Sequence, residues 1–239
     1  MPNRLHSEGD WPDRLTIRRS WAKATARPWN GDGPEVAVRL ERGSSDFLRA
    51  VVDYLRTLAT GDIFSPALYP AATRVWQNAG FSPFSELHLM ERPVGAGQPQ
   101  PAHPITLTPN PDWERLAAVD QQAFTGFWRM SEAGLVEAMT ATPRAIVLEV
   151  AVEGETAGFA LVGAQMTVSF LQRVAVAPSY SGRGLGTSLI RAALVWGASR
   201  GTQSMVLNVR PENIRARQMY EKEGFRGTGS SLVLMRFDD

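Results

Sequence analysis

The sequence predicts an α/β fold in which helices cover a mixed β-sheet. The carboxy-terminal part alternates strand-like apolar runs with segments of helical spacing, as α/β proteins do. A strand over residues 169–177 enters a glycine turn and then a helix over 187–200. A second strand, over 203–209, precedes a helix over 211–222 that ends before Gly224. The 239 residues are enough for two modest domains with hydrophobic cores.

The other elements follow from local signals. Ser131 can cap a helix that runs to about residue 141, and Glu153-Gly154-Glu155 is typical of a hairpin turn. The remaining predicted elements are strands over 105–108, 145–152, 156–164, 225–228 and 231–237 and a helix over 111–124. Between residues 93 and 104 the chain is rich in proline and glycine and nearly uncharged, which predicts a linker.

The composition excludes several kinds of chemistry. Lys and Arg total 25 against 24 Asp and Glu, so no net field favours nucleic acid or an anionic membrane. The absence of cysteine removes disulfides, thiolate metal sites and a cysteine nucleophile. His6, His88 and His103 show no ligand spacing, so we expect no metal. No signal-peptide pattern is found and no apolar run approaches roughly 20 residues, which predicts a cytoplasmic protein.

The glycine turn has the features of a pyrophosphate site. Glycines at 182, 184 and 186 let the backbone turn tightly and direct several N–H groups into one concavity, beside the positive end of the following helix. The spacing excludes GxGxxG, and GxxxxGK[ST] does not occur in the chain. A cofactor other than a dinucleotide or a P-loop nucleotide is therefore expected.

This turn resembles the loop of the GNAT superfamily of acyl-CoA-dependent N-acetyltransferases, Arg/Gln-x-x-Gly-x-Gly/Ala between a strand and a long helix. The sequence at 181–186 fits both glycines but has Ser181 at the first position. The family's other signature, Asn-x-x-Ala-x-x-x-Tyr-x-x-x-Gly-Phe, is matched from Asn213 through Tyr220 to Phe225. The resemblance covers residues 171–237 and implies the GNAT fold and acetyl-CoA as the cofactor.

The resemblance also implies a mechanism and a set of site residues. Acetyl-CoA and a primary amine are bound together, and the amine attacks the thioester directly, with strand amides near Val174 and Ala175 stabilising the carbonyl oxygen. Tyr220 is the expected general acid for the departing thiolate; the alternative is an aromatic ring packed on the sheet. The residues expected to contact the cofactor are Val174, Ala175, Val176, Gly182, Arg183, Gly184, Leu185, Gly186, Thr187, Asn208, Asn213 and Tyr220.

The general base is open at this point, because the strand over 169–177 has no carboxylate. Glu149 shares strand parity with Val147 and is the candidate taken as catalytic; it can equally be an exposed edge glutamate. Further candidates for this role are Glu132, Asp120 and a water relayed through backbone carbonyls. Arg215 and Arg217 can meet the ribose phosphate or can form a solvated helix face.

The amino-terminal half contains a fainter copy of the same ending. Ala72, Trp76 and Gly80-Phe81 lie 144 residues before Ala216, Tyr220 and Gly224-Phe225. Chance is the alternative, since Gly-Phe after a helix is common. Upstream, Ser44 and Ser45 can cap a helix to about residue 59, but the loop over 41–46 has one glycine and acidic flanks, which would repel phosphate.

We therefore predict a degenerate, non-catalytic GNAT-like domain over 12–92, a linker over 93–104 and a catalytic domain over 105–239. The expected function is transfer of acetyl from acetyl-CoA to a primary amine on a small molecule or a protein. The alternative is an acyl-CoA-binding sensor or pseudoenzyme with a protein partner. A monomer and a homodimer are both compatible with the sequence.

Overall fold

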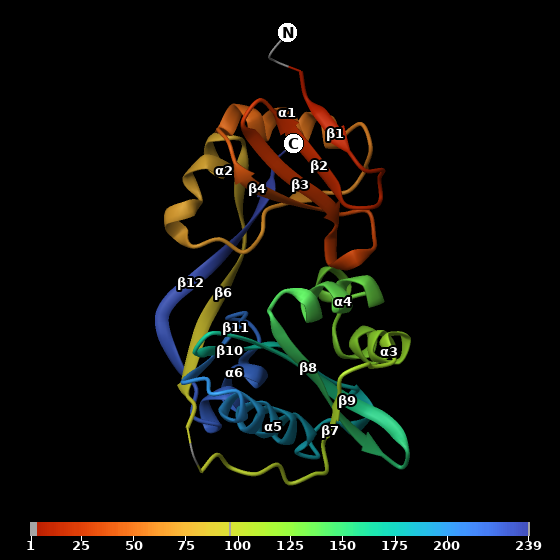
Figure 1. Ribbon diagram of the computed structural model, residues 1–239, viewed down its shortest axis with the longest axis vertical. Helices are drawn as coiled ribbons and strands as arrows, with labels where there is room; N and C mark the ends of the chain where they lie inside the picture. Colours follow the sequence, from red (N-terminus) through yellow and green to blue (C-terminus); the bar gives the residue numbers. More distant parts are fainter. Residues whose placement is uncertain (1–3, 96, 239) are drawn as a thin grey trace. The chain divides into compact units, whose positions relative to one another are not determined.

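The computed structural model describes residues 4–95 and 97–238, which fall into two compact units (Figure 1). The first unit contains residues up to 87 together with residues from 231 onward, and the second contains residues 88–230. Strands β6 (Phe81–Pro93) and β12 (Arg226–Phe237) each contribute residues to both units. Among the described residues, no helix is long and apolar enough to cross a membrane.

The second unit is built on a mixed sheet with strand order β12-β6-β11-β10-β9-β8-β7. Its own strands are β7 (Thr106–Thr108), β8 (Arg144–Val152), β9 (Glu155–Gln165), β10 (Val168–Val176) and β11 (Ser204–Val209). Strands β7 to β10 pair antiparallel, β10 pairs parallel with β11, and β11 pairs antiparallel with β6. The predicted mixed α/β sheet is confirmed.

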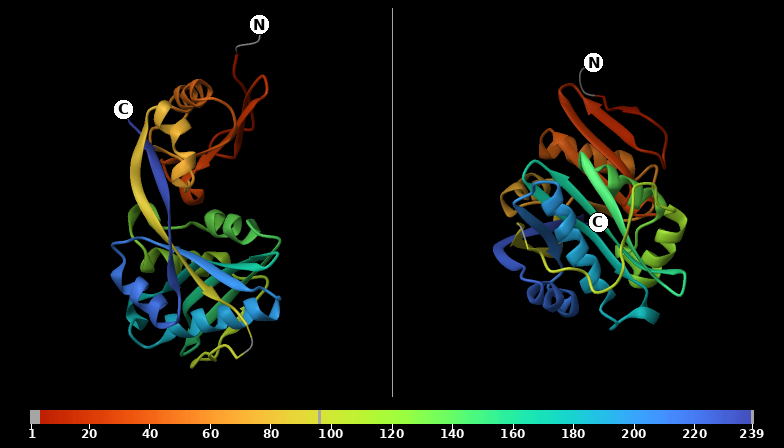
Figure 2. Two further views of the ribbon diagram at one scale, coloured as in Figure 1. Left: turned by 90° about the vertical axis from the view of Figure 1, so that its left-hand side faces the viewer. Right: turned by 60° about the horizontal axis from the view of Figure 1, so that its bottom comes forward.

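Helices cover both faces of this sheet (Figure 2). Helices α3 (Trp113–Ala123) and α4 (Glu132–Thr140) pack on one face, and α5 (Leu185–Ser199) and α6 (Ile214–Lys222) pack on the other. Alternation along β8 divides its side chains between the two cores: Val147 packs with Leu116 of α3, and Leu148 packs with Leu189 of α5.

The first unit packs α1 (Ser45–Leu55) and α2 (Arg74–Asn78) in one core with its strands. Its strands are β1 (His6–Glu8), β2 (Leu15–Arg19), β3 (Ala22–Pro28), β4 (Val36–Arg42) and β5 (Ile63–Phe64), followed by β12. The side chain of Ser44 accepts a hydrogen bond from the Phe47 amide and caps α1, as its sequence predicts.

Three features differ from the expected elements. A single strand, β12, replaces the two predicted final strands, because Gly229 adopts a φ of +75° without leaving the strand. Helix α6 begins at Ile214, after a turn that contains Pro211. The units are also divided at other residues than predicted. Residues 231–238 join the first unit, and Val94, inside the predicted linker, is buried and donates its amide hydrogen to the Gln203 carbonyl at 2.7 Å. Residue 96 of that predicted linker and residue 239 lie outside the described residues.

A cleft at the glycine turn

The second unit contains a cleft of about 490 Å³ beside the glycine turn. Strand β10, the turn, the start of α5 and one side of α6 form its walls. The residues that line it are Val174, Val176, Tyr180, Ser181, Gly182, Gly184, Leu185, Gly186, Thr187, Asn213, Arg215, Ala216, Gln218, Met219, Lys222 and Glu223. Eight of the residues expected at the cofactor are in this set; Ala175, Arg183, Asn208 and Tyr220 are not.

One wall of the cleft is an open edge of strand β10. The parallel pairing of β10 with β11 spans only Val168 to Phe170, although both strands continue beyond it. The amide of Ala177 donates to Ala157 of β9, so strand alternation directs the amide of Ala175 to β9 as well. The amides of Val174 and Val176 then face the open side. The Ala175 side chain is buried with α3 on the other face. The cofactor contact predicted for Ala175 is therefore assigned to Val174 and Val176.

The second wall is the glycine turn. Gly182 and Gly184 both have φ of +80°, a conformation that other residues rarely adopt. A Cβ at Gly182 would meet no atom within 4 Å, and one at Gly186 would lie 3.1 Å from Met219 Sδ of α6. Helix α5 follows with no side-chain cap and no acidic residue in its first turn. The turn therefore offers open space and uncapped backbone N–H donors, which fit a diphosphate.

Helix α6 gives the cleft a cationic side. Arg215 and Lys222 line it directly. Glu223 also lines it, but Arg191 holds both carboxylate oxygens, at 2.9 and 3.0 Å. Arg217, the other predicted phosphate contact, lies 3.5 Å from Glu221 one helical turn away and does not line the cleft. Asn213 caps α6 by accepting the Ala216 amide at 3.2 Å.

Tyr220 is half-buried beside the cleft residues of α6, against the core of the second unit. Its ring makes an edge-on contact with Phe225 at a centroid distance of 5.8 Å. Burial raises the pKa of the Tyr220 phenol to about 12, opposed by the nearby charge of Arg173. The phenol is therefore neutral at physiological pH and a weaker acid than an ordinary tyrosine.

Sequence and structure comparisons agree with this geometry. The acetyltransferase (GNAT) family model matches residues 113–225. The [ribosomal protein bS18]-alanine N-acetyltransferase of Haemophilus influenzae is 30% identical over 114 residues, which cover 48% of this chain and 75% of that protein.

The chain belongs to the GNAT family of acetyltransferases. N-alpha-acetyltransferase 40 of Saccharomyces cerevisiae is 34% identical over 116 residues, but the chain spans only 34% of that protein's length.

The GNAT fold extends over nearly the whole chain. A solved tandem GNAT protein from the clavulanic acid biosynthesis pathway superposes with a TM-score of 0.63 at 13% identity. The superposition covers 99% of this chain and 84% of that one. The likeness concerns the fold alone, and it agrees with the predicted tandem arrangement.

None of the three carboxylate candidates for the base lines the cleft of this GNAT chain. Glu149 is buried on the face that α3 covers, where Arg115 Nη2 lies 3.0 Å from its Oε2. Asp120 is fully buried and receives two hydrogen bonds from Arg173, at 2.6 and 2.7 Å, and one from the Met130 amide at 2.8 Å. Glu132 lies exposed in the first turn of α4. Both buried carboxylates are thus engaged with arginines.

Two other predicted contacts lie away from the cleft. The Arg183 side chain is exposed, with its guanidinium 5.2 Å from the Tyr180 ring centroid. Asn208 is exposed on β11, opposite Leu89 of β6. No group of three or more His, Cys, Asp or Glu that could hold a metal occurs within the described part of the chain.

Sequence reasoning missed Arg173 and His103. Arg173 is the only charged residue in β10, and a lone charge in an apolar strand is a signal that could have identified its buried partner Asp120. It also donates to the Trp128 carbonyl at 2.7 Å. His103 lies 2.9 Å from the Arg183 carbonyl oxygen, across 80 residues of sequence, and no local pattern indicates this contact.

Proposed function

We propose that this GNAT chain is an N-acetyltransferase that moves acetyl from acetyl-CoA to a primary amine, with donor and acceptor bound together. The observation that carries the proposal is the convergence of two backbone surfaces on one cleft: the open edge of β10 and the glycine turn before α5. When bound, acetyl-CoA supplies an activated acetyl group and a thiolate leaving group.

The chain offers candidate contacts for the diphosphate, the pantetheine amides and the acetyl group of this donor. Backbone amides from Gly182 to Thr187 would hold the diphosphate, with Arg215 and Lys222 adding positive charge on the opposite wall. The backbone of Val174 and Val176 would pair with the pantetheine amides as an added strand. Their amide hydrogens would also stabilise the charge that develops on the acetyl oxygen.

Tyr220 is proposed as the group that meets the departing thiolate. A thiol has a pKa of about 8.5, and burial raises that of the Tyr220 phenol to about 12. This difference favours a hydrogen bond to the thiolate over complete proton transfer from the phenol. The phenol is neutral at physiological pH and can donate this hydrogen bond.

The ion pairs of the candidate bases limit which amine can be the acceptor. A lysine amine, with a pKa of about 10.4, needs a base, whereas an α-amine, near 7.7 to 8.0, is substantially uncharged at neutral pH. Since Glu149 and Asp120 are both held by arginines, we propose an acceptor amine of low pKa, such as an α-amine. The names of the Haemophilus and yeast relatives, an alanine N-acetyltransferase and an N-alpha-acetyltransferase, are compatible with this class.

The test begins with binding to the full chain. Acetyl-CoA at tens of micromolar is expected to raise the melting temperature and to bind in calorimetry. Release of free thiol is then measured with peptides that carry a free α-amine, with amino sugars and with a peptide whose only amine is a lysine side chain. We expect turnover with the first and little with the last. Absence of binding would remove the proposal, and binding without thiol release from any amine would favour an acyl-CoA sensor instead.

A further inference from the structure

The chain segment 97–105, between β6 and β7, is docked on α5 (Figure 1). We call it the strap. The amides of Ala102 and His103 both donate to the Oγ of Ser188, at 3.2 and 3.3 Å. Ser188 is fully buried in the first turn of α5, and Ile105 packs against the core of the second unit. The strap is therefore fixed to the helix end that carries the glycine turn.

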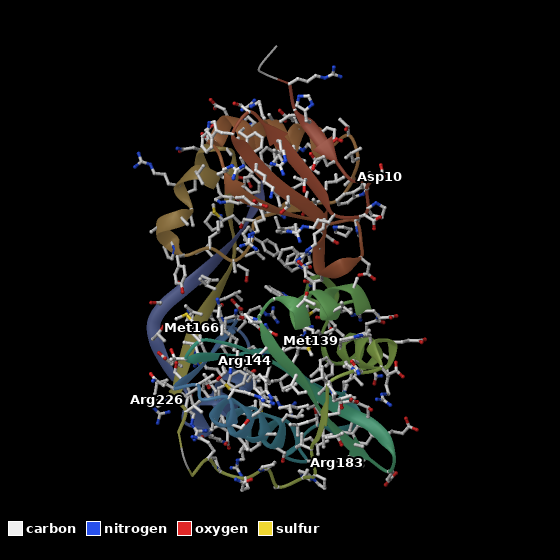
Figure 3. The ribbon with its side chains drawn as sticks, viewed as in Figure 1. Asp10, Met139, Arg144, Met166, Arg183 and Arg226 are labelled. Atoms are coloured by element: carbon white, nitrogen blue, oxygen red, sulfur yellow. The ribbon has the colours of Figure 1, made fainter. Side chains whose placement is uncertain are left out.

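The His103 ring extends from the strap to the turn itself. Its Nε2 lies 2.9 Å from the carbonyl oxygen of Arg183, the residue labelled in Figure 3. Because a carbonyl oxygen only accepts, Nε2 must carry the hydrogen. The same nitrogen lies 3.7 Å from the place that a Cβ on Gly184 would occupy. Neither His103 nor Arg183 lines the cleft, and His103 instead lines a separate pocket together with Ala192 and Trp196 of α5. We therefore take the Arg183 carbonyl to point away from the cleft.

The hydrogen bond from His103 fixes the orientation of the peptide group between Arg183 and Gly184. Its oxygen carries partial negative charge and its N–H partial positive charge, so a rotation of the peptide plane would present the oxygen to an anion in the cleft. Glycine at 184 permits such a rotation because it has no Cβ. A hydrogen bond that holds the oxygen on the far side keeps the N–H groups of the turn directed into the cleft.

We infer that His103 is a positioning residue for the diphosphate-binding turn: it holds the Arg183 carbonyl away from the cleft and so organises the turn for coenzyme A. This inference rests on the proposed function. His103 lies outside both family signatures, in a segment that the sequence predicts to be a linker, and it is added here to the residues proposed to form the coenzyme A site.

A matched pair of variants tests the hydrogen bond separately from the shape of the side chain. His103→Gln retains a donor at similar reach, and His103→Met has similar length without one. For the Met variant we expect coenzyme A affinity in calorimetry to fall roughly 3- to 10-fold, the effect of one hydrogen bond. The KM for acetyl-CoA should rise in parallel while kcat stays constant, and the Gln variant should recover most of the affinity. Equal affinity in wild type, Gln and Met variants would overturn the inference.

Ser188→Ala gives a second approach, since it removes the acceptor of both strap amides. It should weaken coenzyme A binding in the same direction, and its effect should be less than additive with His103→Met. Ser199→Ala, near the other end of α5, is the control: its hydroxyl donates to the Trp196 carbonyl at 2.7 Å and should not affect binding. Full additivity, or a fall in kcat with no change in KM, would contradict a positioning role. If the wild type itself does not bind coenzyme A, the proposed function fails and not this contact alone.

Discussion

The same local structure, a helix that carries an aromatic residue and is followed by glycine and phenylalanine, occurs once in each unit. In the first unit, α2 carries Trp76, and Gly80, with a φ of +97°, follows the helix and precedes Phe81. In the second unit, α6 carries Tyr220, and Gly224, with a φ of +87°, follows the helix and precedes Phe225. In each, the aromatic residue contacts its phenylalanine edge-on, at 4.9 and 5.8 Å between ring centroids. The positive-φ glycine after the helix and the edge-on aromatic contact therefore occur in both units.

The two units differ at the start of another helix, α1 in the first unit and α5 in the second. In the first unit, a Cβ on Gly43 would lie 2.6 Å from Phe47 Cδ1, and Ser44 caps the helix. In the second, Gly182 has open space around it and α5 has no side-chain cap. Packing against Phe47 leaves little room at this helix start, and the Ser44 cap already uses one of its free amides, so it offers less to a ligand than the start of α5. This difference supports one coenzyme A site, in the second unit.

The largest expected effect tests whether the two endings are structurally equivalent. Phe81→Ala and Phe225→Ala each remove a ring that is at most 3% exposed. Each should lower the free energy of unfolding by about 3 to 5 kcal/mol, measured by urea denaturation. A tolerated substitution at either position would show that the two phenylalanines do not serve the same structural purpose.

The next largest effect concerns the residue that differs between the two helices. Tyr220→Phe should lower kcat roughly 100-fold while leaving the KM for acetyl-CoA nearly unchanged, because only the hydrogen bond to the departing thiolate is lost. Trp76→Phe is the matched change in the first unit and should leave kcat unaltered. Unchanged turnover in the Tyr220 variant would remove the role proposed for Tyr220.

A smaller effect is expected at the two glycine loops. Gly184→Val places a β-branched residue at a φ of +80° and should weaken acetyl-CoA binding roughly 10- to 30-fold in calorimetry. Gly43→Ala should instead cost about 1 to 3 kcal/mol of stability through the clash with Phe47, with no change in affinity. A loss of affinity from the Gly43 variant would mean that the first unit contributes to the site.

The smallest effect is a pH dependence that Tyr220 should show. Its pKa is raised to about 12 in the folded chain, against about 10 for an unfolded tyrosine. Between these values the folded state binds more protons, so stability falls as the pH rises from about 10 to 12. By pH 10.5 the wild type should lose on the order of 1 kcal/mol more than Tyr220→Phe in urea unfolding, relative to pH 8.5. Identical losses in the two proteins would indicate a phenol that is solvated in the folded chain.

The mixed sheet, the glycine turn and the caps of α1 and α4 could all be predicted from the sequence. Each depends on signals within one or two helical turns: apolar periodicity, a capping side chain, or a glycine where φ is positive. Helical spacing also places Asn213, Ala216 and Tyr220 toward one side of α6, and the first two line the cleft while Tyr220 packs against the core beside it.

Only the tertiary structure decided which side chains meet. Strand alternation places Glu149 and Val147 on one face of β8. Because α3 packs on that face, the Glu149 carboxylate forms an ion pair with Arg115 of α3. The pairing of Asp120 with Arg173 and of His103 with Arg183 joins segments 53 and 80 residues apart. Such contacts depend on the order of strands and on which helix covers which face, and local sequence patterns do not record either.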